Sequence, residues 1–121
     1  MELRLAQMYS EGVVKRGLSA QRIVELCSAA PARCFGIYPQ KGTIAVGSDA
    51  DIVIFDPEIK LTVFQEMLHE NVDYTPYEGM YLKGYPFMTI SRGEIIAYNG
   101  DFVGELGRGR FLKRGPSDVF R

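Results

Sequence analysis

Apolar residues in the first third of the chain recur at the spacing of a helix. Within residues 2–14 they stand every three or four positions, which places them on one helical face. They are Leu5, Met8, Tyr9 and Val13. Further on, Ser19 can cap a second helix, and Pro31 suits the first turn of a third, short helix that Gly36 ends. The pattern therefore predicts three helices before residue 40.

Beyond residue 40 the pattern changes to short apolar runs of the kind that form strands. Residues 43–46 and 52–55 are β-rich and flank a polar turn, and Asp56-Pro57 is expected to end the second run. Residues 59–63 alternate apolar and polar side chains, which predicts a further half-buried strand. Residues 65–79 show no clear period and predict a long loop.

Two turn signals organise the remaining strands. Ser91-Arg92-Gly93 joins residues 85–91 to residues 94–98 in a predicted hairpin, and Asn99-Gly100 leads into residues 101–103. Helices come first and strands follow, so the sequence predicts the α+β class.

Three segments are expected along the chain. Residues 1–40 form a helical segment, and residues 41–104 form a β-rich segment. After Gly104 the sequence is rich in glycine and basic residues, so residues 105–121 are expected to be an extended tail rather than a packed element.

Composition and charge exclude several classes of partner. The chain has 121 residues, of which 46% are hydrophobic, so it fits a single domain with a packed core. Its 14 basic and 15 acidic side chains leave a formal net charge of -1, which provides no overall field for nucleic acid or an anionic membrane. No apolar run approaches the roughly 20 residues of a membrane span, and the first residues are not expected to be a signal peptide. We therefore predict neither a nucleic-acid partner nor a membrane association.

The two cysteines, Cys27 and Cys34, are seven positions apart. On one continuous helix they would lie roughly 10 Å apart, too far for a disulfide, whereas a break at Pro31 would leave that bond open. Without a C-x-x-C motif a metal site is not expected. Both are interpreted as small buried apolar residues in a reducing compartment, which indicates a cytoplasmic protein.

The residues that could carry chemistry have simpler structural explanations. His69 is the single histidine and falls in the predicted loop, where a surface position is expected. A triad of Ser91, His69 and Asp73 would lack the G-x-S-x-G motif. The carboxylates at residues 49, 51 and 56 lack the pattern of a calcium-binding loop and fit turn formation and strand termination. The sequence therefore predicts no catalytic, metal-binding or substrate-binding residue in this chain.

Two segments are candidate interfaces: the tyrosine-rich end of the long loop and the basic tail. Tyrosine is favoured at interfaces because its ring is buried while its hydroxyl finds a partner, although packing in the chain's own core explains these tyrosines equally well. In the tail, apolar side chains can be buried on a neighbour while the glycines let the backbone follow its surface. The predicted interface residues are Tyr74, Tyr77, Tyr81, Arg108, Arg110, Phe111 and Leu112.

Several blocks of the sequence resemble one family. The longest, Gly42-Thr-Ile-Ala-Val-Gly-Ser-Asp-Ala-Asp-Ile-Val-Ile54, is similar to a late segment of the amidohydrolase superfamily. Other blocks, among them Asn71-Val-Asp-Tyr-Thr-Pro-Tyr-Glu-Gly79 and Gly109-Arg-Phe-Leu-Lys-Arg114, resemble the final quarter of D-hydantoinases and dihydropyrimidinases. Small departures from the family pattern stand at Ala6, Gln7 and Ala29.

The resemblance implies an architecture and a chemistry. It implies that the helices come from the end of a (β/α)8 barrel and that the strands belong to an accessory β-sandwich. It also implies a parent enzyme that hydrolyses C–N bonds of cyclic amides with two divalent metals, usually zinc, and a carboxylated lysine. None of the family's ligand motifs matches a position here, so this chain is expected to hold no cofactor and to be inactive by itself.

A chain of this kind is expected to associate. A sheet without its partner strands has unpaired backbone groups along an edge, and helices taken from a barrel wall expose an apolar face. We therefore expect a homo-oligomer whose further partner is the missing barrel portion of the parent enzyme. The predicted role is scaffold and oligomer interface, and the alternative is a non-catalytic dihydropyrimidinase-like interaction module.

Overall fold

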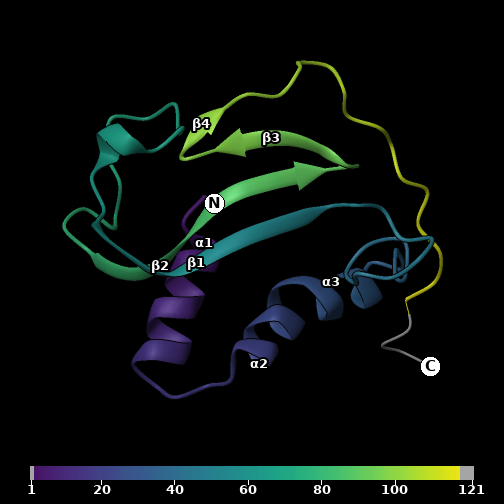
Figure 1. Cartoon of the computed structure of the whole chain (residues 1–121), viewed down its shortest axis with the longest axis horizontal. Coiled ribbons are helices and arrows are strands. Elements are labelled where there is room, and N and C mark those ends of the chain that lie inside the picture. The colour runs from purple at the N-terminus through teal and green to yellow at the C-terminus, as the bar shows by residue number, and fades with distance from the viewer. Residues whose placement is uncertain (1, 118–121) are drawn as a thin grey trace.

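The computed structural model describes residues 2–117. They form a four-stranded antiparallel sheet with helices on one of its faces. Figure 1 shows the helices below the sheet and the carboxyl-terminal segment passing around the right-hand end of the strands. The predicted order of helices followed by strands is confirmed.

The first helical run follows the apolar spacing of the sequence. Helix α1 (Arg4–Gln7) continues directly into the π-helical η1 (Met8–Val14). This run packs on the sheet because Ser10, only 2% exposed, accepts the backbone N–H of Lys83 through its hydroxyl at 3.1 Å.

The second run contains α2 (Ala20–Val24), η2 (Glu25–Ala29) and α3 (Ala30–Cys34) in direct succession. The Ser19 hydroxyl caps it by accepting the backbone N–H of Arg22 at 3.2 Å, as predicted. The predicted third, short helix with Pro31 in its first turn is confirmed as α3, which follows η2 without a break. Pro31 follows the wide turns of η2, whose backbone bonds already depart from the α-helical spacing that a proline would interrupt.

The cysteines lie along this second run and do not pair. Both are free, so the disulfide that a broken helix would have allowed is not formed. Cys27 is partly buried, whereas Cys34 is exposed. The interpretation of Cys34 as a buried residue is therefore wrong, because the end of the run points away from the sheet's small core.

The sheet contains β1 (Ile52–Thr62), β2 (Tyr81–Ser91), β3 (Glu94–Tyr98) and β4 (Asp101–Phe102) in that order. Each neighbouring pair is antiparallel. Both predicted turns are confirmed: Arg92 and Gly93 have φ of 48° and 82°, and Asn99 and Gly100 have 50° and 92°. Two successive residues with positive φ are the backbone shape that two-residue hairpins favour.

Strand β1 passes through the position where the sequence predicts its end. Asp56 pairs with Tyr85 and Lys60 with Lys83, so residues 57–59 lie opposite Gly84 alone. Pro57 has no N–H to donate and falls in this irregularity, which is where a sheet tolerates proline. The two predicted short strands are therefore one bent strand of 11 residues.

Residues 43–46 were predicted as a strand and do not form one. Ile44 is 82% exposed, and no described strand pairs with this segment. Strand propensity mainly reflects packing against neighbouring strands and burial, so a β-rich run without a partner does not become a strand. The prediction fails because the pairing it needs is not provided by the described residues.

The buried apolar cluster is small. It comprises Leu3, Ala6, Val63, Leu68 and Leu82. The chain exposes 8582 Å², whereas a folded monomer of this size is expected to expose about 6,600 Å². The difference of about 2,000 Å² is comparable to the total surface that a specific protein–protein interface buries. Much of the sheet and of the helices therefore lacks a covering layer.

Candidate functional site

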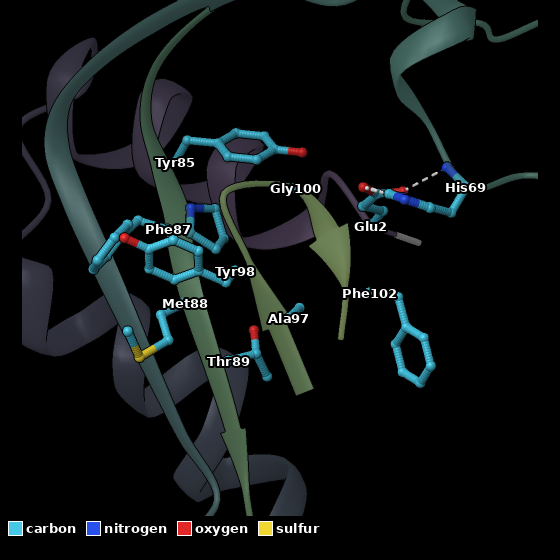
Figure 2. A pocket seen from close by; sticks show the side chains of 11 residues that line it. Glu2, His69, Tyr85, Phe87, Met88, Thr89, Ala97, Tyr98, Gly100 and Phe102 are labelled. Atoms are coloured by element: carbon cyan, nitrogen blue, oxygen red, sulfur yellow. Dashed lines mark hydrogen bonds and ion pairs between the residues drawn. The ribbon is translucent and has the colours of Figure 1, made fainter. Parts of the chain in front are cut away.

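The sheet face that carries no helices contains a hollow beside the single histidine. Figure 2 shows its lining side chains in front of the strands, with the helices behind. The hollow has a volume of about 470 Å³, and its lining includes Tyr85, Phe87, Met88 and Tyr98. Burial, together with the negative charge of Glu2, raises the pKa of Tyr85, so its phenol stays neutral at ordinary pH.

His69 lies at the edge of this hollow and is held by Glu2 (Figure 2). One carboxylate oxygen of Glu2 accepts the His69 backbone N–H at 3.0 Å, and the other lies 3.1 Å from the ring Nδ1. The pair ties the loop to the start of the first helix. His69 is exposed, as expected, and among the residues the structure describes no group of three His, Cys, Asp or Glu side chains could hold a metal ion.

The loop of residues 65–79 folds back on itself into a second hollow of about 400 Å³. The Glu78 carboxylate accepts the backbone N–H of Gln65 at 2.9 Å, and the Gln65 side chain donates to the carbonyl of Val72. The N–H of Gly79 donates to the carbonyl of Val63 at 2.8 Å, which closes the base of the loop. We call this hollow and its rim the loop hollow; it is lined by Phe64, Gln65, Glu66, Asp73, Tyr74, Thr75 and Glu78.

The predicted interface tyrosines belong to this loop or follow it directly. Tyr74, Tyr77 and Tyr81 are all exposed, with Tyr74 at 68%. Packing in the chain's own core, the competing explanation, is therefore wrong for these side chains. Their role in an interface stays a prediction.

The segment after β4, residues 104–117, has no regular structure, but it is not free along its length. We call it the arm. The Arg108 guanidinium donates to the Ser91 carbonyl at 2.8 Å and to the Glu94 carboxylate at 2.7 Å, and its side chain is only 16% exposed. In return, the Arg92 guanidinium donates to the Arg108 carbonyl at 2.5 Å. Arg108 was predicted to be an interface residue, but its charged end contacts its own sheet.

A second anchor holds the far end of the arm. The Gly115 N–H donates to the Gly36 carbonyl at 2.7 Å. Gly36 has φ of +66° and ends the second helical run as predicted, and a Cβ there would collide with the Gly115 carbonyl. The arm is therefore held at two points, Arg108 and Gly115, by hydrogen bonds to the rest of the same chain. Between the anchors Arg110 and Phe111 are exposed and Leu112 is partly buried.

A cluster around Lys41 was not predicted from the sequence. Its ammonium contacts Asp49 at 2.8 Å and also Asp51. Asp51 in turn accepts the Arg92 N–H at 2.7 Å. This joins the loop before β1 to the turn between β2 and β3. The signal in the sequence that could have indicated this cluster is the position of Asp49 and Asp51, eight and ten residues after Lys41.

The charges in this cluster reinforce one another. Partial burial by itself would lower the pKa of Lys41, but its bonds to the two carboxylates raise that pKa above its usual value. Burial by itself would raise the pKa of Asp51, but the bonds from Lys41 and from the Arg92 N–H lower it overall. Lys41 and Asp51 are therefore charged at neutral pH, and the cluster acts as a structural link.

A third hollow, of about 420 Å³, lies between the helices and β1. Its apolar lining includes Tyr9, Val24, Ile44 and Val53, and the last three are exposed. Strand β1 is an edge of the sheet, so this groove runs beside unpaired backbone groups. Among the described residues no helix is long and apolar enough to cross a membrane.

The fold and sequence define the class of this protein. The sequence profile of the Amidohydrolase family matches residues 1–96, and the chain belongs to that family. It is 48% identical over 116 residues to the D-phenylhydantoinase of Escherichia coli O127:H6, a match that covers 96% of this chain and 25% of that protein. The chain thus spans about a quarter of the length of the curated relatives it matches.

Solved structures narrow the class further. The structure matches a D-hydantoinase with a TM-score of 0.87 and 48% identity, over 92% of this chain and 24% of that one. It matches the D-hydantoinase (dihydropyrimidinase) from Thermus sp. with a TM-score of 0.91 and 41% identity, over 96% of this chain and 25% of that one. The resemblance to hydantoinases and dihydropyrimidinases is therefore confirmed.

Proposed function

We propose that this chain is the scaffold and assembly segment of a hydantoinase- or dihydropyrimidinase-like hydrolase that opens the C–N bond of cyclic amides. In this proposal the helices belong to the end of a (β/α)8 barrel and the strands to an accessory β-sandwich. Its partners are the barrel portion of the parent enzyme and further copies of the chain. A cytoplasmic location is part of the proposal.

The observation that supports the proposal is the uncovered surface. The chain exposes 8582 Å² where about 6,600 Å² is expected, and this surface is apolar at the edge of β1 and over the open sheet face. Contiguous exposed apolar surface is typical of a surface that another layer covers. A chain that matches a quarter of its relatives' length and leaves such faces open fits a part of a larger assembly.

The metal centre that the resemblance implies does not fit the residues of this chain. A dinuclear site needs several imidazole and carboxylate ligands around one point, whereas His69 is held by Glu2 and the described residues contain no group of three candidate ligands. No step of the reaction is therefore assigned to side chains described in this structure. Catalysis in the proposal belongs to the barrel portion.

A chimera tests this function. Replacing the matching quarter of the Escherichia coli D-phenylhydantoinase with this chain should preserve hydantoin ring opening, because the segment supplies only scaffold. The chain alone should open no hydantoin above a blank and should retain no stoichiometric zinc after dialysis. Ring opening or two bound zinc ions in the chain alone would overturn the proposal. A chimera that folds and assembles but is inactive would favour the alternative, a non-catalytic dihydropyrimidinase-like interaction module.

A further inference from the structure

The turn between β3 and β4 contains a chemically reactive pair of residues, Asn99 and Gly100. Both are exposed to water. Asparagine is a thermolabile residue, because the backbone nitrogen of the residue that follows can attack its side-chain carbonyl carbon. Glycine has no Cβ to obstruct this approach. The pair that favours a tight hairpin turn is therefore also a pair in which this attack is unhindered.

The second asparagine of the chain provides an internal comparison. Asn71 is also exposed and lies in the loop of residues 65–79, but Val72 follows it. Two branches on the valine Cβ crowd the backbone nitrogen beside them. The chain therefore carries one unhindered and one hindered asparagine, and both are open to water.

The backbone of the turn sets a condition on the reaction. Asn99 has φ of 50° and Gly100 has φ of 92°, so both are in the left-handed region. The attack closes a five-membered ring, and this ring holds the ψ angle of the asparagine outside that region. The turn must therefore open before the ring can form.

Opening of this turn requires the loss of few contacts. Strand β4 is the outermost strand of the sheet (Figure 1) and has two residues, both exposed. They pair with Ala97 and Tyr98 of β3, and beyond them the Val103 N–H donates to the Ile96 carbonyl at 3.0 Å. Segments with few contacts and exposed hydrogen bonds open locally at low free energy. The folded chain therefore gives the reactive pair access to the conformation that it needs.

We propose that Asn99 is a site of spontaneous deamidation, and that the product detaches β4 from the sheet. The Gly100 nitrogen forms a bond to Cγ of Asn99, the bond from Cγ to Nδ2 breaks, and ammonia leaves with the proton that the nitrogen gives up. Water then opens the ring. Where water cleaves the bond between the Asn99 carbonyl carbon and the Gly100 nitrogen, a β-linked aspartate remains. The inference needs no partner or metal and does not depend on the proposed function.

The product does not fit the hairpin that formed it. The β-linkage adds a carbon atom to the backbone of a two-residue turn, and the length of such a turn fixes the register of its strands. The reaction also replaces a neutral amide with a carboxylate beside Asp101, which changes the net charge from -1 to -2. Glu2 lines the same hollow as Asn99 and Asp101. Strain and like charges therefore both oppose the pairing of β4 with β3.

Mass spectrometry of the aged chain tests the first step. The full chain is kept in mildly alkaline buffer, and trypsin then separates Asn99, in residues 93–108, from Asn71, in residues 61–83. Asn99 should convert on the order of tenfold faster than Asn71, because a branched side chain hinders only the latter. An isoaspartate methyltransferase should label residues 93–108. Conversion of Asn99 in the folded chain should stay within about tenfold of its rate in urea, since little structure has to open.

Amide exchange tests the effect on the sheet. In the converted chain the Val103 N–H should exchange about tenfold faster, because its bond to Ile96 is lost with β4. The Asn99 N–H precedes the altered linkage and donates to the Phe87 carbonyl at 2.9 Å, so its exchange rate should not change. Asn99→Gly is the matched control variant, because glycine accepts the positive φ and has no amide to lose. It should keep its Val103 protection after the same incubation.

Three results would contradict the proposal. Equal conversion of the two asparagines would show that Gly100 does not promote the reaction. A folded chain in which Asn99 reacts more than about a hundredfold slower than in urea would show that the turn does not open readily. Unchanged exchange at Val103 in the converted chain would show that β4 stays paired. Ring opening by the hydantoinase chimera is a separate measurement, so either proposal can fail while the other stands.

Discussion

The side chains of Arg92 and Arg108 form reciprocal hydrogen bonds: each donates to a backbone carbonyl at, or next to, the other residue. The Arg92 guanidinium donates to the Arg108 carbonyl at 2.5 Å, and the Arg108 guanidinium donates to the Ser91 carbonyl, next to Arg92, at 2.8 Å. Two side chains of like charge can lie together here because each points at carbonyl oxygens, and Glu94 takes a further bond from Arg108. These hydrogen bonds hold the arm, which has no regular secondary structure, against the sheet.

Removal of this anchor should release the arm. Arg108→Ala loses charged bonds to Ser91 and Glu94, and a loss of about 1.5 kcal/mol raises local opening roughly tenfold. Trypsin should then cut at Arg110, Lys113 or Arg114 roughly ten times faster, at protein concentrations too low for self-association. The control is Arg22→Ala, which removes a surface pair with Glu25. Equal cleavage rates in the two variants would show that Arg108 does not hold the arm.

Gly84 is expected to tolerate no side chain. It has φ of +87° in the middle of β2, and a Cβ would lie 2.5 Å from Cδ1 of Tyr9 and 2.8 Å from Cε1 of Phe55. Gly84→Ala should therefore lower the free energy of unfolding by about 2–4 kcal/mol, from backbone strain and overpacking together. Gly93→Ala has a similar φ but open space around it, and should lose only about 1 kcal/mol. Urea unfolding compares the two, and equal losses would contradict the predicted clash.

The Ser10 hydroxyl is expected to stabilise the contact between the first helical run and β2. Ser10→Ala leaves the partly buried N–H of Lys83 without its acceptor, which should cost about 1–3 kcal/mol. Ser28→Ala alters an exposed helical serine and should change stability by less than about 0.5 kcal/mol. If both variants unfold at the same urea concentration, the hydrogen bond contributes nothing measurable.

Stability should depend on pH through Asp51. Its folded pKa lies below its usual value, so the unfolded chain binds the proton more readily. The contribution of Asp51 is therefore fully present above about pH 5 and is lost as the pH falls through the folded pKa. The pKa of Lys41 is raised instead, so its contribution is present at neutral pH and is lost only as the pH rises through that higher value.

Urea unfolding at several pH values checks this dependence. Asp51→Asn should be less stable than the unaltered chain at pH 7, and the difference should shrink as the pH falls below about 5. Asp101→Asn, at an exposed carboxylate that forms no ion pair with another described residue, should show no such change. A difference between Asp51→Asn and the unaltered chain that is the same at every pH would contradict the cluster's role.

Local features of the chain were predictable because their causes are local. The apolar spacing after Leu3, the cap at Ser19 and the end at Gly36 depend on side chains within a few positions. The turns at Arg92-Gly93 and Asn99-Gly100 follow from residue types that accept positive φ. The tyrosine-rich loop and the basic tail could likewise be singled out from composition alone.

Contacts between segments far apart in the sequence determined the features that the sequence did not predict. Residues 43–46 have the composition of a strand but no described partner strand. Pro57 was expected to end a strand, but β1 continues past it because β1 pairs with β2 on both sides of this proline. Arg108 was indistinguishable in sequence from the exposed Arg110, yet Ser91 and Glu94 bind it. The sequence by itself determined the family and the local elements, since those depend on neighbours in the chain. Only the tertiary structure decided which side chains are held and which face outward, because burial and hydrogen bonding across the sheet depend on residues far apart in sequence.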